Sequence, residues 1–164
     1  MQFVANFKPQ FTKTKKDHAL TDRFDINNKH DSVDNYMTSE LVKFKPDQSV
    51  FEVIDKITKQ KISGGPVVND DGDLVGLISE KDCLKVLVEI VYHNEPERIG
   101  RVKDYMTKEV VTVDANKDVV EVANLFLMTN FRRFPVVDEA GHLVGQVSRK
   151  DILKAVNKFK ATTW

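Results

Sequence analysis

Apolar and polar positions in the first half of the chain follow periods that change from one short block to the next. Val42–Phe44 predicts a short strand, and the spacing of Ser49 and Glu52 is that of a capping box at a helix start. The helix after this box is expected to turn one apolar face inward, because its apolar residues recur at i, i+3, i+4 and i+7. These residues are Val50, Val53, Ile54 and Ile57.

Two further apolar runs, Pro66–Val68 and Leu74–Ile78, predict strands joined by a turn at residues 69–72. Ser79 then opens a second predicted helix. Its apolar residues again fall on one face: Cys83, Val86, Leu87 and Ile90. The first half therefore has the element order β-α-β-β-α.

The same pattern returns 69 residues later without a gap. Of the 54 pairs from Val33/Val102 to Val86/Ala155, 21 are identical. The second copy predicts strands at 111–113, 135–137 and 143–147, a helix capped by Asp118, and a last helix with Ile152, Ala155, Val156 and Phe159 facing the core. Two copies of a long unit predict a pseudo-twofold pair, and the seam of such a pair is a natural ligand site.

The expected fold class is mixed α/β (α+β). A unit of about 55 residues buries too little surface to be stable alone, so the two halves should stabilise each other. The predicted organisation is an N-terminal arm (1–32), a first domain (33–92), a connector (93–101), a second domain (102–157) and a C-terminal tail (158–164).

Charge and composition argue against several classes of function. The chain has 25 basic and 25 acidic residues, which argues against bulk electrostatic capture of nucleic acid or of an anionic membrane. No apolar run is long enough to span a bilayer, and no signal-peptide pattern is visible. The single cysteine, Cys83, can form no internal disulfide, so a cytoplasmic location is expected.

The N-terminal arm carries six basic and four acidic side chains, too small an excess to predict nucleic-acid binding. Four phenylalanines are spread through it: Phe3, Phe7, Phe11 and Phe24. We expect a mostly irregular segment whose phenylalanines dock on the body of the protein or on a partner, and a solvated tail is the alternative.

Several short motifs occur twice in the same order: Tyr-Met-Thr at 36–38 and 105–107, Pro-Val-Val at 66–68 and 135–137, Leu-Val-Gly at 74–76 and 143–145, and Ser-x-x-Asp at 79–82 and 148–151. This ordered set resembles a tandem pair of CBS (cystathionine β-synthase) domains, also called a Bateman module. The resemblance covers residues 33 to about 157. It implies two small three-stranded sheets with helices packed on them, and two clefts at the seam.

The resemblance also implies a function. Members of this family bind AMP, ADP, ATP, S-adenosylmethionine or NAD(H) in the clefts, regulate an attached or associated protein, and usually form disc-like homodimers. The chain is then expected to be a regulatory module for an adenosine-containing ligand, with no required cofactor. We see no nucleophile with a base and no metal-ligand set, so an enzyme is not expected. The alternative is a constitutive dimerisation or protein-interaction module with vestigial clefts.

The two Ser-x-x-Asp motifs open helices, where unpaired backbone N–H groups favour an anion. A serine with an acid three residues later is also an ordinary capping box, worth roughly 1 kcal/mol without any ligand. The resemblance implies that Asp82 and Asp151 bind the ribose diol. Lys81 and Lys150 lie in the first turn of each helix, where the dipole disfavours a cation unless a phosphate is nearby.

The segments before the Pro-Val-Val strands differ between the copies. Arg132 and Arg133 can clamp a phosphate, whereas the first copy has Ser63-Gly64 at these positions. The alternative for the arginines is a solvated basic pair on a loop. We therefore expect the cleft that contains Asp151 to bind a phosphorylated adenosine more strongly than the cleft that contains Asp82.

By the resemblance, each cleft combines residues of both copies. The stronger cleft is expected to comprise Thr38, Ser39, Leu41, Ile62, Ser63, Arg132, Arg133, Ser148, Lys150 and Asp151. The weaker cleft is expected to comprise Thr107, Lys108, Val110, Phe131, Arg132, Ser63, Ser79, Lys81 and Asp82.

Overall fold

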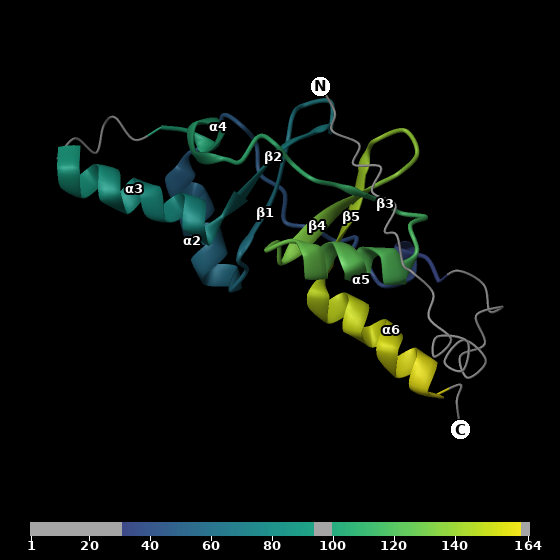
Figure 1. The fold of residues 1–164 in the computed structure, drawn as a ribbon. Coiled ribbons are helices and arrows are strands. Elements are labelled where there is room, and N and C mark those ends of the chain that lie inside the picture. Colours follow the sequence, from purple (N-terminus) through teal and green to yellow (C-terminus); the bar gives the residue numbers. More distant parts are fainter. Residues whose placement is uncertain (1–30, 94–99, 162–164) are drawn as a thin grey trace.

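The computed structural model describes residues 31–93 and 100–161, and these form two similar α+β halves side by side (Figure 1). The first half consists of α2 (Val50–Gln60), β1 (Gly64–Val68), β2 (Leu74–Ser79) and α3 (Glu80–His93). The second consists of β3 (Val113–Asp114), α5 (Val119–Met128), β4 (Arg133–Val137), β5 (Leu143–Ser148) and α6 (Arg149–Ala161). A short helical turn precedes each half: η1 (Val33–Asn35) and α4 (Val102–Tyr105).

Each half contains one small sheet. β1 pairs with β2, and β4 with β5, in antiparallel hairpins. In the second half β3 adds a parallel third strand to β4. In the first half the predicted strand at 42–44 is reduced to one bridge between Phe44 and Val67. The Phe44 N–H donates to Pro66 O and the Val68 N–H donates to Phe44 O, both at 2.9 Å, and the chain then turns at Lys45.

The predicted helix starts are confirmed by their caps. Ser49 Oγ accepts from the Phe51 N–H, and the Asp118 carboxylate accepts from the Val120 N–H. The last helix, α6, continues through Ala161, so residues 158–161 of the predicted tail are helical. Residues 1–30 of the predicted arm and 94–99 of the predicted connector lie outside the described residues, and so does the side chain of Phe159, which was expected in the core.

The two halves exchange their leading segments. Val33 and Tyr36, which precede the first half, are buried in the apolar core of the second half. Val102 and Tyr105, which precede the second half, are buried in the core of the first. Each half therefore completes the other's core, which agrees with the expectation that a unit of this size is not stable alone.

Each core contains one fully buried aromatic ring on its sheet, but from a different strand. Phe44 supplies it in the first half, opposite Gly65 on β1, and a Cβ on Gly65 would lie 3.1 Å from the Phe44 ring. At the equivalent positions the second half has Val113 on β3 and the buried ring of Phe134 on β4. The buried ring thus comes from the segment beside β1 in the first half and from β4 in the second. In each half the other residue of the aligned pair is smaller: Gly65 in the first and Val113 in the second.

Candidate functional site

The two Ser-x-x-Asp motifs have the same geometry. In the first, Asp82 Oδ2 accepts from the Ser79 hydroxyl at 2.6 Å and from the Ser79 N–H at 3.0 Å. In the second, Asp151 Oδ2 accepts from the Ser148 hydroxyl and N–H at the same two distances. The serine oxygen in turn accepts from the aspartate N–H at 3.3 Å in both copies. These contacts are the capping box that the sequence offered as the structural alternative, and they occupy only one carboxylate oxygen.

The other carboxylate oxygen binds a lysine that the sequence reasoning missed. Lys85 Nζ lies 3.1 Å from Asp82 Oδ1, and Lys154 Nζ lies 2.7 Å from Asp151 Oδ1. Both aspartates are largely buried, with 11% and 13% of their side chains exposed. Burial alone would raise the pKa of Asp151, but hydrogen bonds from Lys154 and Ser148 hold this pKa below its usual value. The identical spacing of Asp and Lys in both copies was the available signal.

Each Ser-x-x-Asp motif lies beside a threonine from the other half. Thr38 forms a bridge with Gln146 of β5, two residues before Ser148, with both N–H···O distances at 2.9 Å. Thr107 forms the equivalent bridge with Leu77 of β2, two residues before Ser79. These bridges build the seam, because a strand that ends in the serine of one half is flanked by the leading segment of the other.

Two strand glycines hold these leading segments close. A Cβ on Gly145 would lie 2.6 Å from Met37 Sδ and 3.0 Å from Thr38 O. A Cβ on Gly76 would lie 2.7 Å from Met106 Sδ. The repeated Tyr-Met-Thr and Leu-Val-Gly motifs are therefore two sides of one contact, and this contact places each threonine at the seam.

The segments before the Pro-Val-Val strands also lie at the Ser-x-x-Asp motifs. Arg133 pairs in register with Ser148, and Gly64 with Ser79. Gly64 has a φ of 131°, and a Cβ there would clash with the carbonyl oxygen of Ile78. Since an L side chain rarely adopts this φ, the backbone of the first half cannot present an arginine as the second half does.

The two helix starts carry opposite charges, a difference that the sequence reasoning also missed. Arg149 follows Ser148 and is aligned with Glu80, which follows Ser79. The Arg149 guanidinium also donates to Thr129 O, at the end of α5, at 3.2 Å. Within residues 31–93 and 100–161, Arg132 and Arg133 are exposed and have no ion-pair partner. The Asp151 end of the seam is thus rich in cations.

The structure brings together part of each predicted cleft. Backbone contacts and register connect Thr38, Arg133, Ser148 and Asp151 at one end, and Thr107, Ser63, Ser79 and Asp82 at the other. Ser63 O accepts from the Glu80 N–H at 3.2 Å, so Ser63 lies at the Asp82 motif, and its expected pairing with Asp151 stays a prediction. The other predicted residues with exposed side chains are Ser39, Lys81, Lys108, Phe131 and Lys150, whereas Leu41, Ile62 and Val110 are half-buried.

Other chemistries find little support in the described part of the chain. It contains no group of three or more His, Cys, Asp or Glu side chains arranged to hold a metal ion. None of its helices combines the length and apolar character needed to cross a bilayer. The polar groups that converge at the seam are therefore the candidate site.

Comparison with known proteins agrees with this architecture. The CBS domain family model matches the chain twice, at residues 33–89 and 102–158. The chain belongs to the CBS domain family. Its two copies form a CBS pair, which confirms the predicted family and fold.

Three similar proteins illustrate the match. The uncharacterized protein MJ1426 of Methanocaldococcus jannaschii is 30% identical over 169 residues, which cover 84% of this chain and 98% of that protein. The crystal structure of CBSX2 of Arabidopsis thaliana in complex with AMP is 31% identical, has a TM-score of 0.69, and covers 79% of this chain and 98% of that one. The CBS pair of MJ0100, solved with 5′-methylthioadenosine and S-adenosyl-L-methionine, is 25% identical with a TM-score of 0.65 and covers 79% and 98%.

Some relatives are much longer. The chain spans 42% of one curated relative from Methanocaldococcus jannaschii and 23% of another. The similarity to these two proteins is thus confined to a part of each, and it carries no activity over to this chain.

Proposed function

We propose that this CBS pair is a regulatory module that binds an adenosine-containing ligand at the seam. The observation that carries the proposal is the reciprocal placement of Thr38 beside the Asp151 motif and of Thr107 beside the Asp82 motif. Each end of the seam thus offers a helix start, a carboxylate and a hydroxyl from the other half, which are groups that can bind ribose and phosphate oxygens. The AMP complex of CBSX2 and the 5′-methylthioadenosine complex of MJ0100 support this ligand class.

In this proposal the ribose diol hydrogen-bonds to Asp151 or Asp82. Each aspartate already accepts two hydrogen bonds at Oδ2, from the serine hydroxyl and N–H, and one at Oδ1 from the lysine, so one lone-pair direction remains on Oδ1. One ribose hydroxyl can therefore bind at Oδ1 without breaking the cap, and the second has to replace one of the three present donors. The lysine then shares its carboxylate oxygen with the ribose.

We further propose that the Asp151 cleft binds phosphate better than the Asp82 cleft. Arg132, Arg133 and Arg149 supply guanidinium groups near Ser148, and these bind phosphate oxygens in bidentate fashion. At the Asp82 end the aligned residues are Ser63, Gly64 and Glu80, of which the last repels an anion. A less charged adenosyl compound is the better ligand for that end.

Binding would act through the exchanged leading segments. A ligand that contacts Thr38 and Asp151 touches both halves, so its affinity depends on how the halves are oriented. A partner that recognises one orientation would then be regulated by the ligand, with a coupling free energy of typically 1–3 kcal/mol. We place this regulation in the cytoplasm, where the free thiol of Cys83 fits a reducing environment.

Thermal unfolding of ligand-free protein with AMP, ATP, NADH or S-adenosylmethionine tests ligand binding. A ligand at 100 times its dissociation constant stabilises the native state by about 2.7 kcal/mol. For a chain of this size, that corresponds to a rise in Tm of roughly 5–10 °C. No shift with any of the four compounds would contradict the proposal and favour the alternative, an interaction module with vestigial clefts.

Calorimetric titration of AMP into two matched variants tests the asymmetry. Asp151→Ala should weaken AMP binding more than Asp82→Ala, because the Asp151 cleft holds the additional cations. Both changes remove the same cap, which costs about 1 kcal/mol of stability in each case, so each variant controls for the other's loss of folding stability. Equal losses of affinity would remove the difference between the clefts.

We also propose that the chain forms a homodimer. Large apolar side chains are exposed on the helices of the second half, among them Leu127, Met128, Leu153 and Val156. An apolar helix face of this kind is a typical association surface. Light scattering should give twice the chain mass, and Leu153→Glu should shift it to the monomer. A monomer for the unmodified chain would refute the dimer but leave ligand binding open.

A further inference from the structure

Each aspartate at the seam is paired with a lysine from the next turn of its own helix. Lys154 lies three residues after Asp151, and its Nζ is 2.7 Å from Oδ1 of that carboxylate. Lys85 lies three residues after Asp82, at 3.1 Å from the equivalent oxygen. The lysine side chains are 59% and 56% exposed, whereas both carboxylates are largely buried. A solvated cation therefore covers one oxygen of each buried carboxylate.

The hydrogen-bonding capacity of these carboxylates is nearly filled. A carboxylate has about four acceptor directions. At Asp151, the Ser148 hydroxyl and N–H donate to Oδ2, and Lys154 Nζ donates to Oδ1. The Asp82 carboxylate accepts from the equivalent donors of its own half. A ligand with one hydroxyl can use the direction that remains on Oδ1, but a ribose diol brings two donors and has to replace one that is present.

The present donors differ in how easily they are replaced. The Ser148 N–H belongs to the backbone at the start of α6 and would lose its acceptor. The Ser148 hydroxyl accepts from the Asp151 N–H at 3.3 Å, so its movement would loosen the cap. Lys154 can turn its ammonium group into water, and ion pairs of such exposed lysines are weak. The lysine is therefore the donor that a diol replaces most easily.

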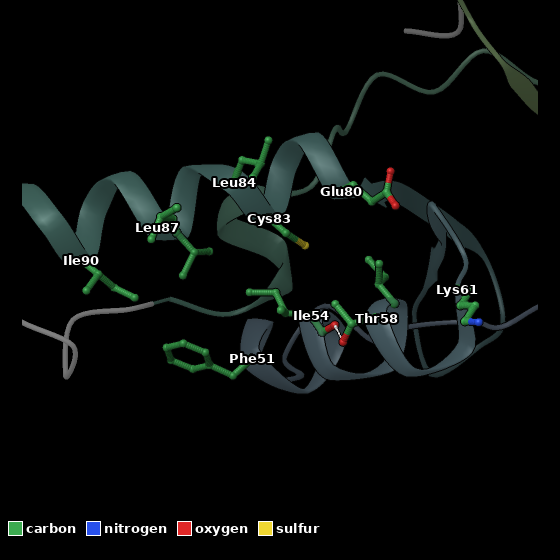
Figure 2. A pocket seen from close by; sticks show the side chains of 11 residues that line it. Phe51, Ile54, Thr58, Lys61, Glu80, Cys83, Leu84, Leu87 and Ile90 are labelled. Atoms are coloured by element: carbon green, nitrogen blue, oxygen red, sulfur yellow. Dashed lines mark hydrogen bonds between the residues drawn. The ribbon is translucent and has the colours of Figure 1, made fainter.

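The departure of the lysine does not disturb the packing between helices. In the first half, the sulfur of Cys83 projects from α3 toward α2, where it lines an apolar pocket with Leu84 and Leu87 (Figure 2). Asp82 and Lys85 are neighbours on another face of α3. Breaking their ion pair therefore leaves the contacts between α2 and α3 in place.

Given the proposed binding of an adenosine-containing ligand at the seam, we propose that Lys154 and Lys85 determine how strongly each cleft prefers ribose to 2′-deoxyribose. In the free protein each lysine occupies part of the position that the diol takes. A 2′-deoxyribose has one hydroxyl, which binds beside the lysine, whereas a ribose displaces the lysine. The cost of this displacement lowers the affinity for ribose alone, so the lysine reduces the discrimination between the two sugars.

A pair of nucleotides that differ by one hydroxyl tests this role. AMP and 2′-deoxyadenosine monophosphate (dAMP) are titrated calorimetrically into Lys154→Met, in an Asp82→Ala background that weakens the other cleft. The ratio of AMP affinity to dAMP affinity should rise about three- to fivefold, which is the contribution expected of an exposed ion pair. Loss of the cation weakens the attraction of both phosphates equally, so this ratio isolates the ribose contact. An unchanged or lower ratio would overturn the proposal.

The conservative variant separates the ion pair from the other properties of the side chain. Lys154→Arg keeps a cation and a donor on the same turn of α6, so the ratio of affinities should stay close to that of the unsubstituted residue. A rise as large as that of Lys154→Met would show that the ion pair is not responsible. If neither nucleotide binds to the unsubstituted protein, the proposed ligand class fails, and this role of Lys154 fails with it.

A second readout uses the unsubstituted protein. Acetylation of Lys154 by an activated ester is followed by peptide mass spectrometry with saturating AMP and with saturating dAMP. Both nucleotides cover the cleft to the same extent, so a difference in rate reports the release of the lysine. Acetylation should be about threefold faster with AMP, because the displaced ammonium group is free of its carboxylate. Equal rates would refute the exchange, even if Lys154→Met failed to fold.

Discussion

The two halves of this protein share a scaffold but not a surface chemistry. The capping contacts of Ser79 with Asp82 and of Ser148 with Asp151 have equal distances in both halves, and the threonine bridges at the seam are equivalent. The residues next to these contacts differ in charge, size and backbone conformation. A duplicated unit can therefore keep the same structural contacts in both copies while the surfaces around these contacts diverge.

The two leading segments are also attached by different side-chain contacts. In one half the Tyr36 hydroxyl donates to the carboxylate of Asp31, which also pairs with Lys158 of α6. In the other half the Tyr105 hydroxyl donates directly to Glu89 of α3 at 2.5 Å. Glu89 and Lys158 occupy aligned positions, so the charge has reversed and an additional aspartate compensates for it.

The largest expected effect tests whether the halves are one cooperative unit. Phe44→Ala and Phe134→Ala each remove a fully buried ring and should each lower the free energy of unfolding by about 3–5 kcal/mol. Because each half buries the other's leading segment, both variants should still unfold in a single transition. Urea denaturation followed by circular dichroism measures both quantities, and a separate early transition for one half would show that the halves are independent.

An intermediate effect concerns the charges at the two helix starts. Arg149→Glu should weaken AMP binding at the Asp151 end about tenfold, or ~1.4 kcal/mol, because it places a carboxylate beside the phosphate site. Glu80→Arg, the matched change in the first half, should strengthen binding at the Asp82 end. Calorimetry at low and high salt measures both changes, and the effects should shrink as salt screens the charges. No effect of Arg149→Glu would remove that residue from the phosphate site.

The smallest effect separates the two tyrosine contacts. Tyr36→Phe should lower stability by about 1–2 kcal/mol, because the largely buried Asp31 carboxylate loses a donor. Tyr105→Phe should cost less, since Glu89 is exposed and regains water. Thermal unfolding of both variants at neutral pH measures the difference, and equal losses would contradict it.

The pH dependence of that difference follows from Asp31. Burial would raise the pKa of Asp31, but hydrogen bonds from Tyr36, Lys158 and Asn35 lower this pKa in the folded state. A lowered pKa contributes stability above the unfolded value of about 4, and this contribution is lost as the pH falls through the folded value. The excess loss in Tyr36→Phe should therefore diminish below pH ~4, whereas a constant difference would show that Asp31 is not involved.

Much of the scaffold could be predicted because it is encoded locally. The N-cap residues Ser49 and Asp118 and the 3.6-residue period after them predict helices, because these contacts join neighbours in the chain. The strand predicted at 42–44 was too long, because only Phe44 meets the neighbouring strand. The local sequence pattern does not show how many residues of a segment pair with a strand that is distant in the chain.

The repeat, the family, the order of the elements and the motifs that reach the seam can all be predicted from the order of residues in the chain. Three features require the folded protein: the half that each leading segment completes, the pairing of Lys85 and Lys154 with the buried aspartates, and the backbone conformation of Gly64, which excludes arginine. The physical reason is the range of the interactions. Periodicity and caps act within a few residues, whereas the seam joins segments that are far apart in the chain and meet only when both cores have packed.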